Sequence, residues 1–334
     1  MTTKSGKKWP FDDQKQILHM GKALGWTTDP GWGTDPDWAT RFRVRSPLAL
    51  ASTEDTGGPT VSLGYHPDLP DLRDRCFANL PKPEITELGK RFPLLASKSD
   101  LPRRVNNISW CSPVEDQGNL GSCTAQAVVG LMEYMQRRSG TQHVDGSRLF
   151  VYKVSRKLQG WTGDTGSYLR TTIKAVAAFG MPPEQYWPYM IEQFEEEPTA
   201  FLYASASNYQ ALKYTRLDPP AVDGKGTLAA LKRTLSSGFS SVFGFPVYSS
   251  LTGSGEIPFP GSNDKLLGGH AVMAVGYDDD HGKNGALVIR NSWGSKWGYG
   301  GYGFLPYEYV EQGLAQDFWT VLKSEWLDLE QFEE

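Results

Sequence analysis

The sequence predicts an α+β fold in which a helical half precedes an antiparallel β half, with a cleft between them. Up to Gly238 the apolar residues recur at helical spacing, and the helical patterns end on glycines. After Gly238 the chain becomes a series of short β-branched and aromatic runs separated by turns. With 334 residues, 39% of them hydrophobic, the chain can bury a sizeable core.

The helical half is organised around a helix that begins at Cys123. A glycine-punctuated loop over 116–122 precedes it, and the apolar run that follows contains no proline and a single glycine, Gly130, which a helix tolerates. Ser122 is suited to be the N-cap. A thiol in the first turn lies near unpaired N–H groups and the positive end of the helix dipole, so we expect a lowered thiol pKa.

The other elements follow from periodicity and stop signals. Helices are predicted over 147–154, 171–179 and 228–235. The second of these ends at Gly180, and the third is capped by Thr227 and stopped by Gly238. Strands are predicted over 241–245, 268–277, 286–290, 301–305 and 318–322. The proline-bearing stretch 217–224 is predicted to cross between the two halves.

Two later stretches change the interpretation of Cys123, which by itself would be a small buried residue. His270 enters an apolar strand over 268–277, and Asn291 ends another within 288–298. Together with the Gln117 that precedes Gly-Ser-Cys, these motifs resemble, in content and order, the papain family of cysteine peptidases. The resemblance covers residues 102–323 and implies a papain-like two-lobe fold.

The resemblance also implies acyl transfer through a thioester on Cys123. His270 would take the thiol proton, and Asn291 would hold the imidazole in its productive orientation. Gln117 would donate its side-chain amide to the oxyanion, beside the backbone N–H of Cys123. Trp293 would cover the contact between Asn291 and His270. Singly, each residue has a plain structural interpretation: a satisfied core histidine, a turn asparagine or a surface glutamine.

Four residues are candidates for substrate binding: Gly166, Ser167, Gly269 and Trp293. The turn that holds Gly166 and Ser167 matches the place where papain relatives pair with extended peptide through backbone hydrogen bonds. The alternative is an ordinary loop before a helix. Gly269 and the stretch 243–246 are candidate walls of a side-chain pocket.

The sequence departs from the papain pattern in three places. Leu120 stands where a disulfide cysteine is usual, and the partner cysteine near Asp164 is also missing. Thr124 replaces the usual Trp or Tyr. These changes remove a crosslink and alter packing, but they touch no group that does chemistry.

Two other classes of function stay open. A non-catalytic peptide-binding module on the same scaffold would normally lack the Cys, His or Gln that this chain keeps. A transglutaminase-like acyl-transferring enzyme shares the Cys–His chemistry but usually has an acid as the third member, where this chain has Asn291.

The composition limits the partners and cofactors. A net charge of −4 predicts neither nucleic-acid nor membrane binding, and we expect a monomer that acts on peptide or protein substrates. We expect no metal and no cofactor, because the remaining histidines lack ligand spacing and the acidic stretch 278–280 is typical of a solvated turn. With no signal peptide at the start, the protein is cytoplasmic, or a leader is missing from the sequence. Cys76 and Cys111 are either bridged or two buried thiols.

Three regions are predicted along the chain. Residues 1–100 form an N-terminal extension, residues 101–323 the peptidase domain, and residues 324–334 an acidic tail. The boundary between the helical lobe, 101–218, and the β lobe, 219–323, lies in the crossing described above. Within the extension we expect a helix over 11–24, an edge strand over 41–45 and a linker over 51–60.

The extension is a candidate inhibitor of the peptidase domain. Residues 65–74 are held extended by their prolines, which suits a strand laid along a peptide-binding cleft. Tethering would keep it there at high effective concentration. The alternative is an extension packed on the back of a lobe by its tryptophans, Trp9, Trp26, Trp32 and Trp38.

Overall fold

The computed structural model of the chain describes residues 63–69, 71, 73–76, 101–140 and 144–326. The helix, edge strand, linker and four tryptophans predicted before residue 62 therefore lie outside the described residues, and so does the end of the tail. The helices are α5 (Cys123–Arg138), α6 (Arg148–Leu158), α7 (Leu169–Phe179), α8 (Ala200–Ala206), α9 (Gly224–Ser236) and α10 (Glu308–Glu311). Short 3-10 turns are η2 (Ile108–Trp110), η3 (Glu184–Tyr186) and η4 (Ile191–Gln193). None of the described helices is long and apolar enough to cross a bilayer.

The strands of the described residues form one antiparallel sheet and one short parallel pair. The strands are β1 (Tyr65–His66), β2 (Arg104–Asn106), β3 (Ser167–Tyr168), β4 (Tyr209–Arg216), β5 (Ser241–Tyr248), β6 (Leu266–Asp278), β7 (Ala286–Arg290), β8 (Tyr302–Pro306) and β9 (Gln316–Trp326). The sheet has the order β4-β9-β5-β6-β7-β8, and β2 pairs with β6. The pair β1–β3 is parallel, with Tyr65 opposite Ser167.

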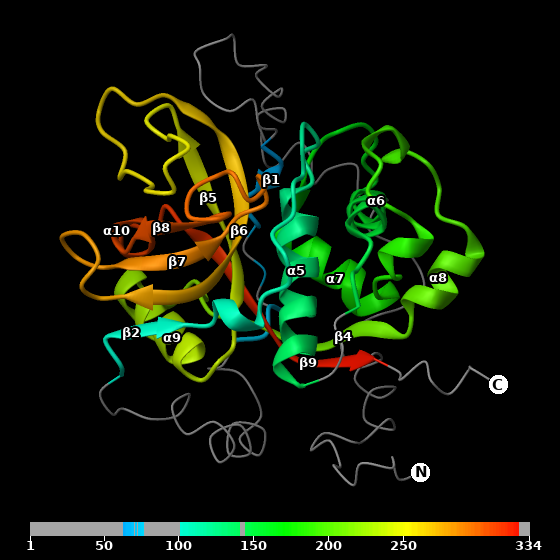
Figure 1. Cartoon of the computed structure of the whole chain (residues 1–334), viewed down its shortest axis with the longest axis horizontal. Coiled ribbons are helices and arrows are strands. Elements are labelled where there is room, and N and C mark those ends of the chain that lie inside the picture. Colours follow the sequence, from blue (N-terminus) through cyan, green and yellow to red (C-terminus); the bar gives the residue numbers. More distant parts are fainter. Residues whose placement is uncertain (1–62, 70, 72, 77–100, 141–143, 327–334) are drawn as a thin grey trace, which may run out of the picture. The chain divides into compact units, whose positions relative to one another are not determined.

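The predicted α+β fold is confirmed. Helices α5 to α8 gather on one side, and strands β5 to β8 with α9 and α10 lie on the other (Figure 1). The β side has its own core, in which Leu228, Leu231 and Leu235 of α9 pack on buried residues of the sheet. Burying aliphatic side chains of this size stabilises the folded state by about 1.5–3 kcal/mol each.

Several element boundaries differ from the prediction. Helix α9 begins at Gly224, because Asp223 rather than Thr227 caps it by accepting a hydrogen bond from the N–H of Gly226. Strand β4 was not predicted; it carries the sheet into the helical half by pairing with β9. Strand β9 in turn continues to Trp326, past the predicted domain end at residue 323.

Helix α5 joins the two halves. Nearly all of its residues are buried, from Cys123 to Gln136. The Arg290 guanidinium from β7 crosses the helix at Gly130, where an added Cβ would overlap it. That guanidinium also donates to Ser112 Oγ and to the carbonyl of Pro113. The glycine in α5 is therefore required by a buried arginine from the β half, and this contact helps to fix where Cys123 lies.

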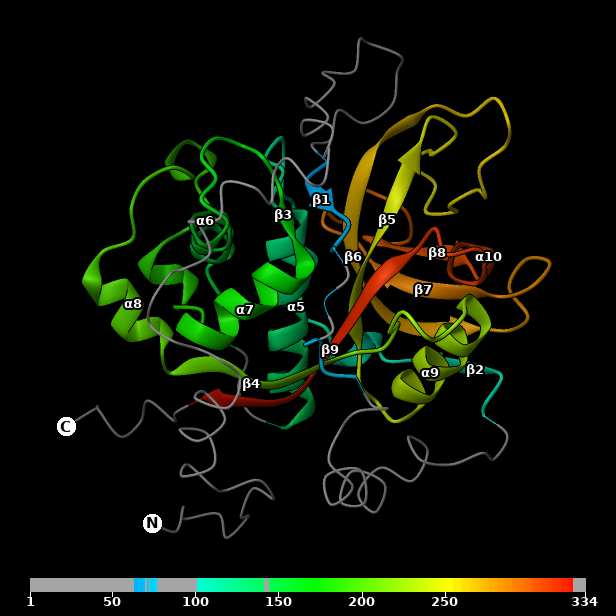
Figure 2. The ribbon, with the colours of Figure 1, turned by 180° about the vertical axis from the view of Figure 1, so that it is seen from behind.

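Residues 63–69 run between the two halves. Figure 2 shows β1 beside β3 and next to β6, between the helices and the main sheet. Residues 73–76 continue to the far end of β4, where the carbonyl of Arg75 accepts from the N–H of Arg216. We call residues 63–76 the N-terminal segment, and all statements about it concern its described residues.

Candidate active site

The candidate residues come from three elements that meet at the junction of the halves. Cys123 is the first residue of α5, His270 lies in the middle of β6, and Asn291 follows β7 directly. Cys123 and His270 have no exposed surface, and Asn291 is 3% exposed. The thiol receives a hydrogen bond from the backbone of Ala271, the residue after His270. The fold therefore brings the candidate nucleophile and base together.

The contact between His270 and Asn291 fixes the tautomer of the imidazole. His270 Nε2 lies 2.7 Å from Asn291 Oδ1, and the same oxygen accepts from the N–H of Ser292 at 2.8 Å. Because Oδ1 is an acceptor, Nε2 must be the donor, so a neutral ring carries its lone pair on Nδ1. Nδ1 is buried and has no hydrogen-bond partner within the described part of the chain. Nδ1 is therefore the unoccupied acceptor of the ring.

Aromatic rings hold the imidazole from two sides. Trp293 stacks on His270 at 4.4 Å between ring centroids, with 25° between the planes. Phe245 meets it edge-on at 5.9 Å. Trp293 was predicted both to cover the contact between Asn291 and His270 and to bind substrate. Its ring contacts within the described residues are with His270 and Trp297, which favours the covering role.

Gln117 is fully buried and held in one orientation. Its Oε1 accepts from Ser292 Oγ at 2.6 Å, and its Nε2 donates to the carbonyl of Leu120 at 3.0 Å. The side-chain amide thus faces the loop that leads into α5. It shares Ser292 with the Asn291 contact, so the candidate oxyanion donor and the candidate triad belong to one network.

Ser122 is the N-cap residue of α5, but its side chain does not cap the helix. Its hydroxyl bonds Tyr189 Oη at 2.6 Å instead, and Tyr189 also donates to the carbonyl of Gln117. The first-turn N–H groups of α5 are therefore not used by Ser122 Oγ.

The N-terminal segment lies directly over Cys123. The backbone of Gly64 makes a hydrogen bond to the thiol, and the Gly64 carbonyl accepts from the N–H of Ser167 at 2.8 Å. A Cβ added at Gly64 would overlap the carbonyl oxygen of Gly121, and a Cβ added at Gly166 would overlap the Gly64 carbonyl. Only a chain without a side chain at position 64 fits between these two loops.

The covered site is electrically neutral. Burial raises the pKa of the Cys123 thiol to about 11, against the opposing effect of backbone hydrogen bonds from Ala271 and Gly64. Burial also lowers the pKa of His270 to about 4, although its bond to Asn291 acts in the other direction. The expected lowering of the thiol pKa is therefore wrong for this conformation, because desolvation outweighs the helix terminus.

The other candidate substrate residues surround the segment. Gly166 and Ser167 contact it through the backbone, as described above. Gly269 faces Tyr65, since a Cβ there would overlap the Tyr65 carbonyl. Gly244, within the predicted pocket wall 243–246, faces the ring of Tyr65 in the same way. The predicted substrate positions are thus occupied by the protein's own chain.

The missing crosslink is replaced by hydrogen bonds. Asp164 accepts from the N–H of Gly121 at 3.0 Å and from Tyr152 Oη at 2.5 Å, so the loop that carries Leu120 is still tied down. Cys76, Cys111 and Cys123 are all free and buried, which favours two buried thiols over a bridge. The described residues contain no cluster of His, Cys, Asp and Glu able to hold a metal.

Sequence reasoning missed Gly64 and Asp317. No motif surrounds Gly64, whose importance depends on the close approach of Gly121 and Gly166. Asp317 is buried and contacts the segment, yet in the sequence it is a single aspartate before an apolar run. The positive φ of 59° at Asp317 could not be read from that pattern.

Comparison with known proteins agrees with the geometry. The family profile described as "Papain family cysteine protease" matches residues 97–318. An uncharacterized peptidase C1-like protein of Acanthamoeba polyphaga mimivirus is 34% identical over 286 residues, spanning 80% of this chain and 88% of its own. Cathepsin K of Gallus gallus is 30% identical over 201 residues, 59% of this chain and 55% of its own.

A solved structure with a similar fold is xylellain, a cysteine protease from Xylella fastidiosa. It is 32% identical, with a TM-score of 0.64 over 83% of this chain and all of xylellain. Digestive procathepsin L 3 of Tenebrio molitor shares the fold at 20% identity and a TM-score of 0.52, over 78% of this chain and 84% of its own.

Proposed function

Because the chain belongs to the papain family of cysteine peptidases, we propose that it cleaves peptide bonds through a thioester on Cys123 and that its N-terminal segment holds it inactive. The activity rests chiefly on the pairing of His270 with Asn291, which leaves Nδ1 as a buried acceptor on the same strand whose Ala271 backbone contacts the thiol. The inhibition rests on the position of Gly64 over that thiol.

In the proposed reaction the Cys123 thiol gives its proton to His270 Nδ1, and the sulfur attacks the peptide carbonyl carbon. The oxyanion is bound by Gln117 Nε2 and the backbone N–H of Cys123. The imidazolium then protonates the departing amine, which leaves a thioester on Cys123. A water molecule, deprotonated by His270, hydrolyses the thioester and restores the thiol. Asn291 holds the ring so that one nitrogen serves both proton transfers.

The proposed inhibition has two physical causes. Gly64 occupies the space over the sulfur that a substrate carbonyl would need, with its own carbonyl bonded to Ser167. The segment also excludes water, and desolvation keeps both the thiol and the imidazole neutral. Its departure would let water return, and the helix terminus would then favour the thiolate.

Displacing the segment without shortening the chain tests the proposal. Gly64→Glu should force the segment off, because even a Cβ overlaps Gly121. We expect the wild-type chain to cleave a fluorogenic peptide slowly and Gly64→Glu to cleave it quickly, with no cleavage when Cys123→Ala is added. Equal activity of the wild type and Gly64→Glu would contradict inhibition. Cleavage that survives Cys123→Ala would contradict the assignment of the nucleophile.

A further inference from the structure

The side chain of Tyr65 fills a pocket between two strands of the main sheet. Its walls include Gly244 of β5 and Gly269 of β6, and an added Cβ at Gly244 would overlap the ring. Its hydroxyl donates to Asp317 Oδ2 at 2.6 Å, and the tyrosine is only 6% exposed. Two glycines at diagonal positions of neighbouring strands, offset by two residues, therefore leave room for one aromatic ring, with a carboxylate at its far end.

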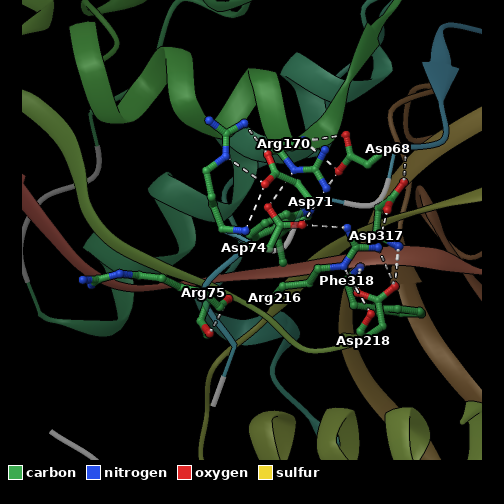
Figure 3. A network of polar contacts seen from close by, with 12 residues as sticks. Asp68, Asp71, Asp74, Arg75, Arg170, Arg216, Asp218, Asp317 and Phe318 are labelled. Carbon is green, nitrogen blue, oxygen red and sulfur yellow. Dashed lines mark hydrogen bonds and ion pairs between the residues drawn. The ribbon is translucent and has the colours of Figure 1, made fainter. Parts of the chain in front are cut away.

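The carboxylate of Asp317 is held in place by the body of the protein. Asp218 accepts from the N–H groups of Asp317 and Phe318 at 2.8 and 3.0 Å, which fixes the turn of the backbone there. Arg216 donates to Asp317 Oδ1 at 2.6 Å and is itself held by Asp218. Figure 3 shows Arg216, Asp218, Asp317 and Phe318 together at this point.

The backbone at Asp317 is specialised for this orientation. Strands β5 and β9 lose register between the pairs Val242–Trp319 and Gly244–Gln316, so β9 has an extra residue there. Asp317 has a φ of 59°, which is unusual for a residue other than glycine. Bulges of this kind often redirect a side chain near an active site. The bulge thus places a buried carboxylate beside the glycine wall of the pocket.

We infer that Asp317 determines substrate specificity, and that the pocket vacated by Tyr65 selects peptides with tyrosine at the matching position. The inference rests on the proposed function, since it treats the segment as an occupant of the substrate cleft. One oxygen of Asp317 stays bonded to Arg216 after the segment leaves. The second oxygen loses its two donors, the Tyr65 hydroxyl and the N–H of Asp68, and is free to accept from a substrate side chain.

Charge favours a neutral donor over a cation. Asp68 and Asp74 leave with the segment, and Arg170 and Arg216 then remain with Asp218 and Asp317. Two positive and two negative side chains balance, so an incoming arginine or lysine would add an uncompensated charge beside two guanidinium groups. A phenol donates without adding charge. Burial and the nearby Asp317 raise the pKa of Tyr65 well above its ordinary value, so the hydroxyl keeps its proton.

The test compares full-length Gly64→Glu enzyme on matched peptides. Tyrosine is placed in turn at each of the four residues before the scissile bond, and each peptide is paired with its phenylalanine counterpart. At one position we expect kcat/KM for tyrosine to exceed that for phenylalanine by roughly 10- to 100-fold, as for a hydrogen bond to a charged acceptor. Asp317→Asn should reduce this ratio to within a few-fold, because the charged acceptor of the tyrosine hydroxyl is lost. Asp280→Asn, an exposed carboxylate, should keep the wild-type ratio.

The outcomes separate the inference from its premise. Cleavage by Gly64→Glu without a tyrosine preference at any position would overturn the inference and leave the proposed inhibition standing. A preference for arginine over tyrosine would overturn the choice of a neutral donor. If the wild-type chain is as active as Gly64→Glu, the inhibition is wrong, and the tyrosine ratio is then measured on the wild type. If Asp317→Asn fails to fold, Tyr65→Phe in the otherwise wild-type chain supplies the second measurement. It should speed alkylation of Cys123 about 10-fold or more, and no change would contradict the pocket.

Discussion

The N-terminal segment meets the rest of the chain at two places of opposite character. Over Cys123 and His270 the contact is neutral and made by backbone and glycine. At the other end it is made by buried ionisable side chains. Asp68 and Asp74 of the segment lie against Arg170, Arg216, Asp218 and Asp317 of the body, a group that we call the anchor cluster (Figure 3).

The difference indicates that the two contacts have separate roles. In the proposed inhibition the neutral contact would block the chemistry, because Gly64 would take the place of a substrate carbonyl. The anchor cluster supplies the strong contacts, with Arg170 bidentate on Asp74 at 2.8 and 2.5 Å. Because the strong contacts lie away from the nucleophile, breaking them would release the segment without altering the active site.

The largest effects are expected for substitutions of the candidate catalytic residues near the neutral contact. They distinguish the loss of an oxyanion donor from the loss of the base that activates Cys123. In the Gly64→Glu background, Gln117→Ala should lower kcat by about 10²- to 10³-fold, because one oxyanion donor is lost. Alkylation of Cys123 should change little, since the thiolate depends on His270. His270→Ala should abolish both. If Gln117→Ala and His270→Ala reduce alkylation equally, Gln117 is structural and its assigned role is wrong.

A change in the anchor cluster should release the segment without touching the chemistry. Asp74→Ala removes the partner of Arg170 and one partner of Arg216, so we expect alkylation of Cys123 in the full-length chain to accelerate about 10- to 100-fold. Asp71→Ala is the matched control, because Asp71 bonds mainly to Arg73 within the same segment. Equal effects of the two substitutions would argue against a localised anchor.

The smallest expected effect is a dependence of docking on pH. Burial and the charge of Asp317 raise the pKa of Asp68 to about 7, against the opposing Arg170 and Arg216. A released Asp68 would have a pKa of about 3.9, so the docked state binds the extra proton. The contribution of Asp68 to docking is full below about pH 4 and is lost as the pH rises through about 7.

The pH dependence of docking is measured by hydrogen exchange of the amides of residues 63–76, corrected for intrinsic exchange rates. We expect protection to be roughly 70-fold greater at pH 5 than at pH 7.5, and the difference to shrink in Asp68→Asn. Stronger protection at pH 7.5 would mean that the cluster favours the ionised form of Asp68, so that its pKa is lowered on docking rather than raised.

The candidate residues that depend on residue type and order could be predicted from the sequence. Cys123, His270, Asn291 and Gln117 come from distinct motifs, and the elements that carry them follow from local periodicity. Strand β4 was missed because Tyr209–Arg216 does not alternate between polar and apolar residues; it becomes a strand by pairing with β9. The thiol pKa was predicted in the wrong direction because its desolvation comes from Gly64, far away in the chain. Asp317 could not be predicted, since its role depends on a bulge and on contacts with Tyr65, Arg216 and Asp218.

The proposed inhibition requires that the segment keep the nucleophile neutral and covered. The most direct test is the rate of Cys123 alkylation as a function of pH, read by peptide mass spectrometry so that Cys76 and Cys111 are counted separately. For the wild-type chain we expect slow alkylation with a midpoint near pH 11. For Gly64→Glu we expect fast alkylation with a midpoint below the free-thiol value of about 8.5. Coincident profiles, or a wild-type midpoint below about 8.5, would contradict the inhibition.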